Sequence, residues 1–165
     1  MSIIARKFMA HYIDAAAPED FDELFELFGD GVEEFTPQMS AKVDKKQNIL
    51  GHTNVVISGY EKTCEVPTYY TNPGSELHSR LMSIIDDGKT LDSLKTRVVD
   101  VYLWRPKQEE GYFASMENAY IEIKSYGGDT SGVQIPFTLH YTGERQKGYF
   151  DVERKAFTPE EPEEE

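Results

Sequence analysis

The feature that most constrains the fold is a regular alternation of side chains near the C-terminal end of the chain. Over residues 133–141, every second side chain is apolar or aromatic, and the residues between them form a mainly polar face. The apolar face consists of Val133, Ile135, Phe137, Leu139 and Tyr141. A period of two is typical of a β-strand with one buried face. Pro136 lacks a backbone donor, so we expect an edge position or a break in the ladder there.

Related patterns recur through the rest of the chain. Strands are expected over residues 55–60, 62–68, 96–104 and 113–126, the first two meeting near Gly59. The segment Gly127-Gly128-Asp129 predicts a turn that closes the longest of these strands. Residues 142–145 have turn composition, so residues 148–157 are expected to return as the second strand of a hairpin.

One helix is predicted over about residues 73–87. Asn72 suits its N-cap, Pro73 its first position and Gly88 its end. Its apolar stripe consists of Leu77, Leu81, Ile84 and Ile85. Such a stripe would pack on a sheet, with His78 beside it at the surface. The sequence therefore predicts a mainly β protein, a β-sandwich or partly closed barrel with one flanking α-helix and a long early loop.

Two early segments are less regular. Residues 21–28 fit either a helix or strands that turn at residues 29–31, while residues 36–49 have little periodicity and predict a long connecting loop. We expect a single domain over residues 1–158, with an N-terminal arm at 1–12. Residues 159–165 are expected to form an acidic, disordered tail.

Charge is concentrated in two blocks. The 165 residues include 30 acids and 17 Lys and Arg, a formal net charge of −13. Residues 18–34 hold eight acids and residues 159–165 hold five, neither with a base, so the rest of the chain is balanced. Ordinary nucleic-acid binding needs Lys and Arg against phosphates and is not expected. The blocks either have a placed function or form a solvated face and a disordered tail.

The chain contains none of the sequence motifs that mark common catalytic or metal sites. Its four histidines are scattered without metal-ligand spacing, and no P-loop, GxSxG or GxGxxG motif occurs. Cys64 is expected to pack in a strand as a small apolar residue. No run approaches the roughly 18 apolar residues of a membrane span. We therefore expect no enzymatic activity, no cofactor, no metal and no membrane partner.

The order of the expected elements resembles a known family. Short strand pairs precede the helix at 72–88, which leads into the Val-rich strand at 96–104. A strand ending in a Gly-Gly turn (120–129) then precedes an apolar strand pair and the terminal segment Phe157-Thr158-Pro159. Over about residues 47–159, this order resembles the major tail tube proteins of tailed bacteriophages, and it looks most like the long, non-contractile type of Gram-positive hosts.

The resemblance implies a structural virion protein made in the bacterial host cytoplasm. Such subunits form hexameric rings whose sheets join into an inner β-barrel, and the rings stack into a tube around a tape-measure protein. Tail-terminator and baseplate proteins would be further partners, and DNA would pass through without specific binding. By position, the arm at 1–12, the C-terminal end and the early loop would contact neighbouring subunits or rings. The loop residues in question are Phe35, Met39, Val43 and Ile49.

A tube that passes a polyanion benefits from a negatively charged wall. The strand carboxylates Glu117, Glu122 and Asp151 are candidates to face the lumen. A tube subunit of a contractile tail or injection device, related in fold to type VI secretion tubes, is an alternative in the same structural class. A small-ligand-binding β-barrel or small enzyme with an aromatic interior is the alternative from another class.

Overall fold

The computed structural model describes residues 1–18 and 23–161, which form a mainly β structure with one α-helix. The strands are β1 (Met9–Asp14), β2 (Phe25–Phe28), β3 (Ala41–Gln47), β4 (Thr53–Tyr60), β5 (Thr63–Val66), β6 (Lys95–Tyr102), β7 (Tyr112–Ile123), β8 (Gly127–Asp129), β9 (Gly132–Gln134), β10 (Phe137–Asp151) and β11 (Ala156–Pro159). The helix is α1 (Glu76–Asp87), and short 3₁₀ turns occur at η1 (Arg6–Phe8) and η2 (Leu91–Leu94). The predicted mainly β class with one helix is confirmed.

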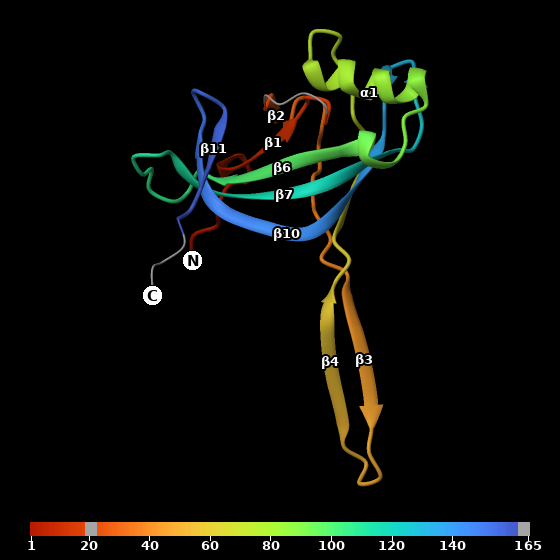
Figure 1. The fold of residues 1–165 in the computed structure, drawn as a ribbon, viewed down its shortest axis with the longest axis vertical. Helices are drawn as coiled ribbons and strands as arrows, with labels where there is room; N and C mark the ends of the chain where they lie inside the picture. The colour runs from red at the N-terminus through yellow and green to blue at the C-terminus, as the bar shows by residue number, and fades with distance from the viewer. Residues whose placement is uncertain (19–22, 162–165) are drawn as a thin grey trace.

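Seven strands form one antiparallel sheet that curls into a half-barrel (Figure 1). The strand order is β11-β10-β7-β6-β1-β2, and β5 joins through the first part of β10. Strand β10 is long enough to pair with β5 near its start and with β11 near its end. The sheet does not close on itself, so β2 and β11 remain as edges.

Two clusters of buried side chains hold the half-barrel together. The helix places Leu77, Leu81 and Ile84 in the larger cluster, together with apolar residues of the sheet. The smaller cluster lies toward the β11 side, where the Tyr12 ring packs on the Phe150 ring with centroids 4.3 Å apart. Because β6 contributes to both clusters, it is buried on both faces.

The helix ends where the sequence predicts but begins later. Gly88 ends it in the left-handed conformation that glycine adopts without strain, at φ 58°. The N-cap, however, is Ser75, whose hydroxyl accepts the backbone N–H of His78. Asn72 instead accepts the N–H of Gly74 in a turn before the helix. The predicted positions of Asn72 and Pro73 are therefore wrong, because a second capping residue lies three positions after Asn72.

The C-terminal strands differ from their predicted boundaries. The ladder breaks at Pro136 as expected, so residues 132–134 form β9 and β10 begins afterwards. The expected turn at 142–145 is instead a bulge within β10, because the β7 register shifts between Tyr141 and Arg145. The chain reverses later, at 152–155, and β11 follows. Residues 127–129 are not a closing turn but strand β8, which pairs with β9.

The predicted early loop is also a strand. Residues 41–47 form β3, which pairs with β4 in a long hairpin that projects from the half-barrel (Figure 1). Strands β4 and β5 do not pair with each other; β5 pairs with β10. The loop prediction failed because β3 is exposed along its whole length and has no buried face to impose alternation.

The predicted segment boundaries at both ends need correction. Residues 9–12 do not belong to an arm, because they lie in β1 between β2 and β6. Pro159 belongs to β11 rather than to a tail, and the Glu160 N–H still donates to the Lys147 carbonyl. Positions 19–22 of the acidic 18–34 block, positions 162–165 of the tail and part of the helix alternative at 21–28 lie outside the described residues.

Candidate functional site

The β3–β4 hairpin presents an apolar face to solvent. Directly paired residues project to the same side of a two-stranded ribbon. Val43 pairs with Ile57, and Val55 lies two residues before Ile57 on β4, so these three side chains share a face. Tyr60, which pairs with Ala41, extends the same face toward the body. All four large side chains, Val43, Val55, Ile57 and Tyr60, are more than half exposed.

The hairpin tip is held in a defined shape. The Asn48 side-chain oxygen accepts the backbone N–H groups of Leu50 and His52, each at 3.0 Å. Gly51 adopts a positive φ of 82°, which completes the turn. Ile49 and Leu50 are thereby presented at the apex, where they are fully or largely exposed.

An isolated two-stranded hairpin is marginally stable in water, and a continuous exposed apolar surface usually marks an interaction site. In this hairpin the apolar face runs from Tyr60 at the base to Val55, which is paired with Lys45, and the polar pair Gln47 and Thr53 separates it from the exposed Ile49 and Leu50 at the tip. The opposite face carries Asp44, Lys46 and Asn54, together with one exposed apolar residue, Val56. The hairpin is therefore built to be covered on one side.

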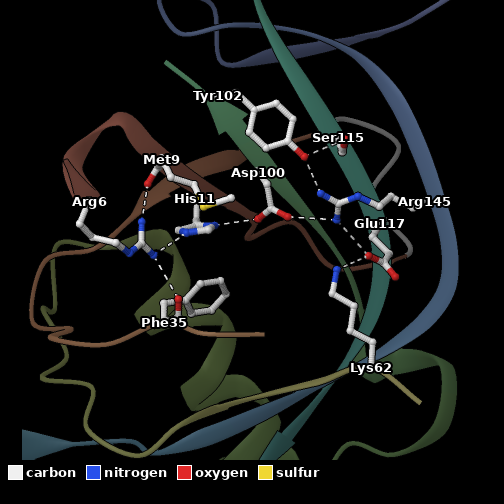
Figure 2. Close-up of polar contacts among 10 residues, drawn as sticks. All are labelled: Arg6, Met9, His11, Phe35, Lys62, Asp100, Tyr102, Ser115, Glu117 and Arg145. Atoms are coloured by element: carbon white, nitrogen blue, oxygen red, sulfur yellow. Dashed lines mark hydrogen bonds and ion pairs between the residues drawn. The ribbon is translucent and has the colours of Figure 1, made fainter. Parts of the chain in front are cut away.

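A cluster of ionisable side chains, centred on the buried His11, Asp100 and Glu117, lies on the sheet of the half-barrel (Figure 2). His11 on β1 and Asp100 on β6 are opposite one another in register, and both are buried. The His11 Nδ1 atom is 2.7 Å from the Asp100 Oδ1 atom, and Arg145 Nη1 donates to Asp100 Oδ2 at 3.1 Å. Both carboxylate oxygens of Asp100 thus have partners, as a buried charge requires.

Glu117 on β7 forms the second half of this cluster. Lys62 Nζ is 2.8 Å from its Oε1 atom, and Arg145 Nη1 approaches the same oxygen at 3.3 Å. Arg145 also donates to the Tyr102 hydroxyl at 2.7 Å. Arg145 therefore links the two buried carboxylates, and Lys62 connects them to the segment that follows the hairpin (Figure 2).

The hydrogen bonds fix the tautomer of His11. Arg6 Nη2 lies 2.7 Å from His11 Nε2, and a guanidinium group can only donate. Nε2 must therefore accept, so Nδ1 carries the proton that is donated to Asp100. Arg6 also donates to the backbone carbonyls of Met9 and Phe35. These contacts attach the exposed N-terminal residues to the body.

The cluster keeps Asp100 ionised. Burial opposes its charge, but the hydrogen bond from His11 and the nearby positive charges of Arg145 and Lys62 outweigh it, so the Asp100 pKa lies below its ordinary value. His11 Nε2 is occupied by Arg6 and contacts no hydroxyl or thiol nucleophile in the described structure. The contacts of this cluster join β1, β6, β7 and β10 with one another and with the N-terminal segment.

The three expected lumenal acids have different surroundings. Glu117 is a correction: it is buried in the cluster and neutralised by Lys62, so it cannot present charge to a lumen. Glu122 is partly exposed and pairs with Lys124 and His140, and these contacts lower its pKa. Asp151 accepts the backbone N–H groups of residues 153 and 154 in the β10–β11 turn.

Of the four residues expected to contact neighbouring subunits or rings, one is buried and three are exposed. Phe35 is a correction: it is buried, and its ring packs against His11 at 4.5 Å and Phe28 at 5.3 Å. Met39, Val43 and Ile49 are exposed, at the base, on the apolar face and at the tip of the hairpin respectively.

Sequence reasoning missed the buried cluster, although one signal was present. Asp100 interrupts an apolar run between Val99 and Val101, and an acid in such a position needs a buried partner. The identity of the partners could not be read from the sequence, because Arg145 lies 45 residues away and reaches Asp100 only through the fold.

Among the described residues, no group of three or more His, Cys, Asp or Glu side chains is placed to hold a metal ion. No helix in the same part of the chain is long and apolar enough to cross a membrane. In comparisons with known proteins, no family model matches the chain, and no curated protein matches it significantly in sequence.

Proposed function

We propose that the chain is a structural virion protein, the subunit of a phage tail tube, which assembles into stacked hexameric rings. The observation that carries this proposal is the projecting hairpin with an exposed apolar face of Val43, Val55 and Ile57 and an apolar tip. A surface of this kind needs a partner, and a neighbouring ring of identical subunits supplies one.

The open sheet supports the same proposal. Strands β2 and β11 end the half-barrel with unpaired backbone groups, which are an association or aggregation hazard unless covered. In a closed ring, each edge meets the opposite edge of the next subunit, so that the half-barrels complete an inner β-barrel. Heterologous contacts that close in this way remove every free edge.

The proposed tube surrounds a tape-measure protein during assembly, ends at tail-terminator and baseplate proteins, and later carries DNA without binding it specifically. The subunit is made in the host cytoplasm and functions in the virion, without catalysis. With Glu117 buried, the proposed wall charge rests on Glu122 and Asp151. Because Glu122 is paired with Lys124 and His140, the wall would be weakly rather than strongly negative.

A contractile tail or injection device would use the same hairpin and the same open sheet. It differs by a sheath that surrounds the tube, so binding of a sheath protein to preformed tubes distinguishes the two. A small-ligand-binding barrel would instead remain monomeric and would gain thermal stability with its ligand.

The proposal is tested with lysines on the apolar face of the hairpin. Val55→Lys with Ile57→Lys should abolish assembly, measured as the loss of species about six times the 18.9 kDa of one chain or larger in size-exclusion light scattering. Asn54→Lys, on the opposite face of the same strand, is the matched control and should assemble normally. Equal assembly of the double variant and wild type would overturn the role of the hairpin.

A further inference from the structure

The half-barrel has a cavity of about 560 Å³ beside the C-terminal end of β6. It is open to solvent and lies where β6, β7 and β10 run side by side, beyond the buried charge cluster. The residues that matter in its lining are Tyr102, Arg105, Phe113, Ser115, Arg145 and Lys147.

The cavity gathers positive charge that the chain does not neutralise. Among residues 1–18 and 23–161, neither Arg105 nor Lys147 has a carboxylate within ion-pair distance, whereas Arg145 in the same lining is already paired with Asp100 and Glu117. The Arg105 guanidinium is held over the Phe113 ring, 4.2 Å from its centroid. Two cations without a carboxylate partner, Arg105 and Lys147, therefore line one cavity of a chain whose net charge is −13, and they can bind an anion from outside this set of contacts.

A hydroxyl completes the site. Tyr102 donates to the Ser115 oxygen at 3.2 Å, and the Ser115 hydroxyl hydrogen has no acceptor among the described residues. A planar guanidinium, an ammonium and a hydroxyl donor together suit the oxygens of a carboxylate. Glu160 lies in the same lining, and its backbone N–H bonds to the Lys147 carbonyl.

A source of such carboxylates lies elsewhere on the surface. Asp30, Glu33 and Glu34 follow β2, at the opposite edge of the sheet order from β11. They are exposed, and none has a cation within ion-pair distance in the described structure. Complementary charges on different parts of one open sheet suit head-to-tail contacts between copies.

We propose that the cavity bounded by Arg105, Arg145 and Lys147 is a carboxylate-binding site, and that its ligand is the acidic 30–34 segment of a second copy of this chain. The identification of the ligand as a second copy depends on the proposed self-assembly. Binding of the isolated segment, however, is measured without assembly, so the two can fail separately.

The probe is a synthetic peptide with the sequence of residues 28–36, titrated calorimetrically at low salt into the full-length chain that carries Val55→Lys and Ile57→Lys, so that assembly does not fill the cavity. Arg105→Gln and Lys147→Gln are each expected to weaken binding about tenfold, and added salt should weaken it further. Lys155→Gln, an exposed cation in the β10–β11 turn, is the matched control and should bind like wild type. A control peptide in which all three acids are replaced by their amides, through Asp30→Asn, Glu33→Gln and Glu34→Gln, should not bind.

No binding, or equal binding by the Arg105 and Lys147 variants, overturns the proposal even if rings form. Binding that becomes measurable only after Glu160→Gln with Glu161→Gln would mean that the chain's own C-terminal glutamates fill the cavity, and it would overturn the second copy as the source. If the peptide binds but no assembly occurs, the carboxylate site stands and the proposed function fails.

Discussion

Asp100 is the residue on which the buried cluster depends, because its two oxygens join His11 to Arg145. We expect Asp100→Asn to lower the free energy of unfolding by about 2–4 kcal/mol, since it leaves the His11 and Arg145 donors without their charged acceptor. Urea denaturation at pH 6 measures this. Glu122→Gln, which removes a partly exposed acid, should remain close to wild type.

The effect of Asp100 should depend on pH with a defined sign. Its pKa in the folded chain lies below the ordinary 3.8, so its stabilising contribution is present above that value. The contribution is lost as pH falls through the lower, folded pKa. The stability difference between wild type and Asp100→Asn should therefore shrink below about pH 4. A difference that grows on acidification would contradict the ion-pair description.

Cys64 provides a second test at the residue scale. It is fully buried in β5, and burial raises the pKa of its thiol to about 12. Because the thiolate is the reactive form, the native protein should react with a thiol reagent orders of magnitude more slowly than the urea-unfolded chain. Rapid labelling under native conditions would show that β5 does not remain paired with β10.

At the scale of elements, Arg80 fastens α1 to the sheet. Its guanidinium donates to the backbone carbonyls of Ala16, Ser93 and Lys95, at 2.6, 3.2 and 2.7 Å. These carbonyls belong to the connection after β1, to η2 and to the start of β6. The helix is thus positioned by a buried side chain as well as by its apolar stripe.

Arg80→Met keeps most of the length of the side chain but removes the donors, so we expect it to cost about 2–4 kcal/mol of unfolding free energy. Thermal and urea unfolding followed by circular dichroism measure the loss. Arg154→Met, whose side chain is largely exposed in the β10–β11 turn, is the matched control. A loss no larger than that of the control would show that the three carbonyls do not depend on Arg80.

The elements that the sequence predicts well are those with a regular pattern of buried side chains. The helix stripe is confirmed, and strands are found where 96–104 and 113–126 predict them, because burial imposes a period that local reading detects. Both strands end earlier than predicted, at Tyr102 and Ile123. The hairpin was missed in part, since β3 has exposed side chains on both faces and three lysines. The sequence predicts a turn at the position of the bulge around Gly143, because glycine favours turns and bulges alike.

At the scale of the molecule, the buried charges and the cationic cavity could not be predicted. They bring together residues such as Lys62 and Glu117, which are 55 positions apart and meet only when β10 pairs with both β5 and β7. The −13 charge itself could be read directly, but its meaning changes with the fold. Glu117 is an internal ion-pair partner, whereas Asp30, Glu33 and Glu34 remain free to meet a second copy.

We propose that the half-barrel is an incomplete unit that closes by assembly. Negative-stain electron microscopy of the purified full-length chain, over a range of concentrations, tests this most directly. We predict six-membered rings and hollow stacked tubes that are absent from the Val55→Lys, Ile57→Lys variant. Uniform monomeric particles at every concentration, for wild type and variant alike, would contradict it.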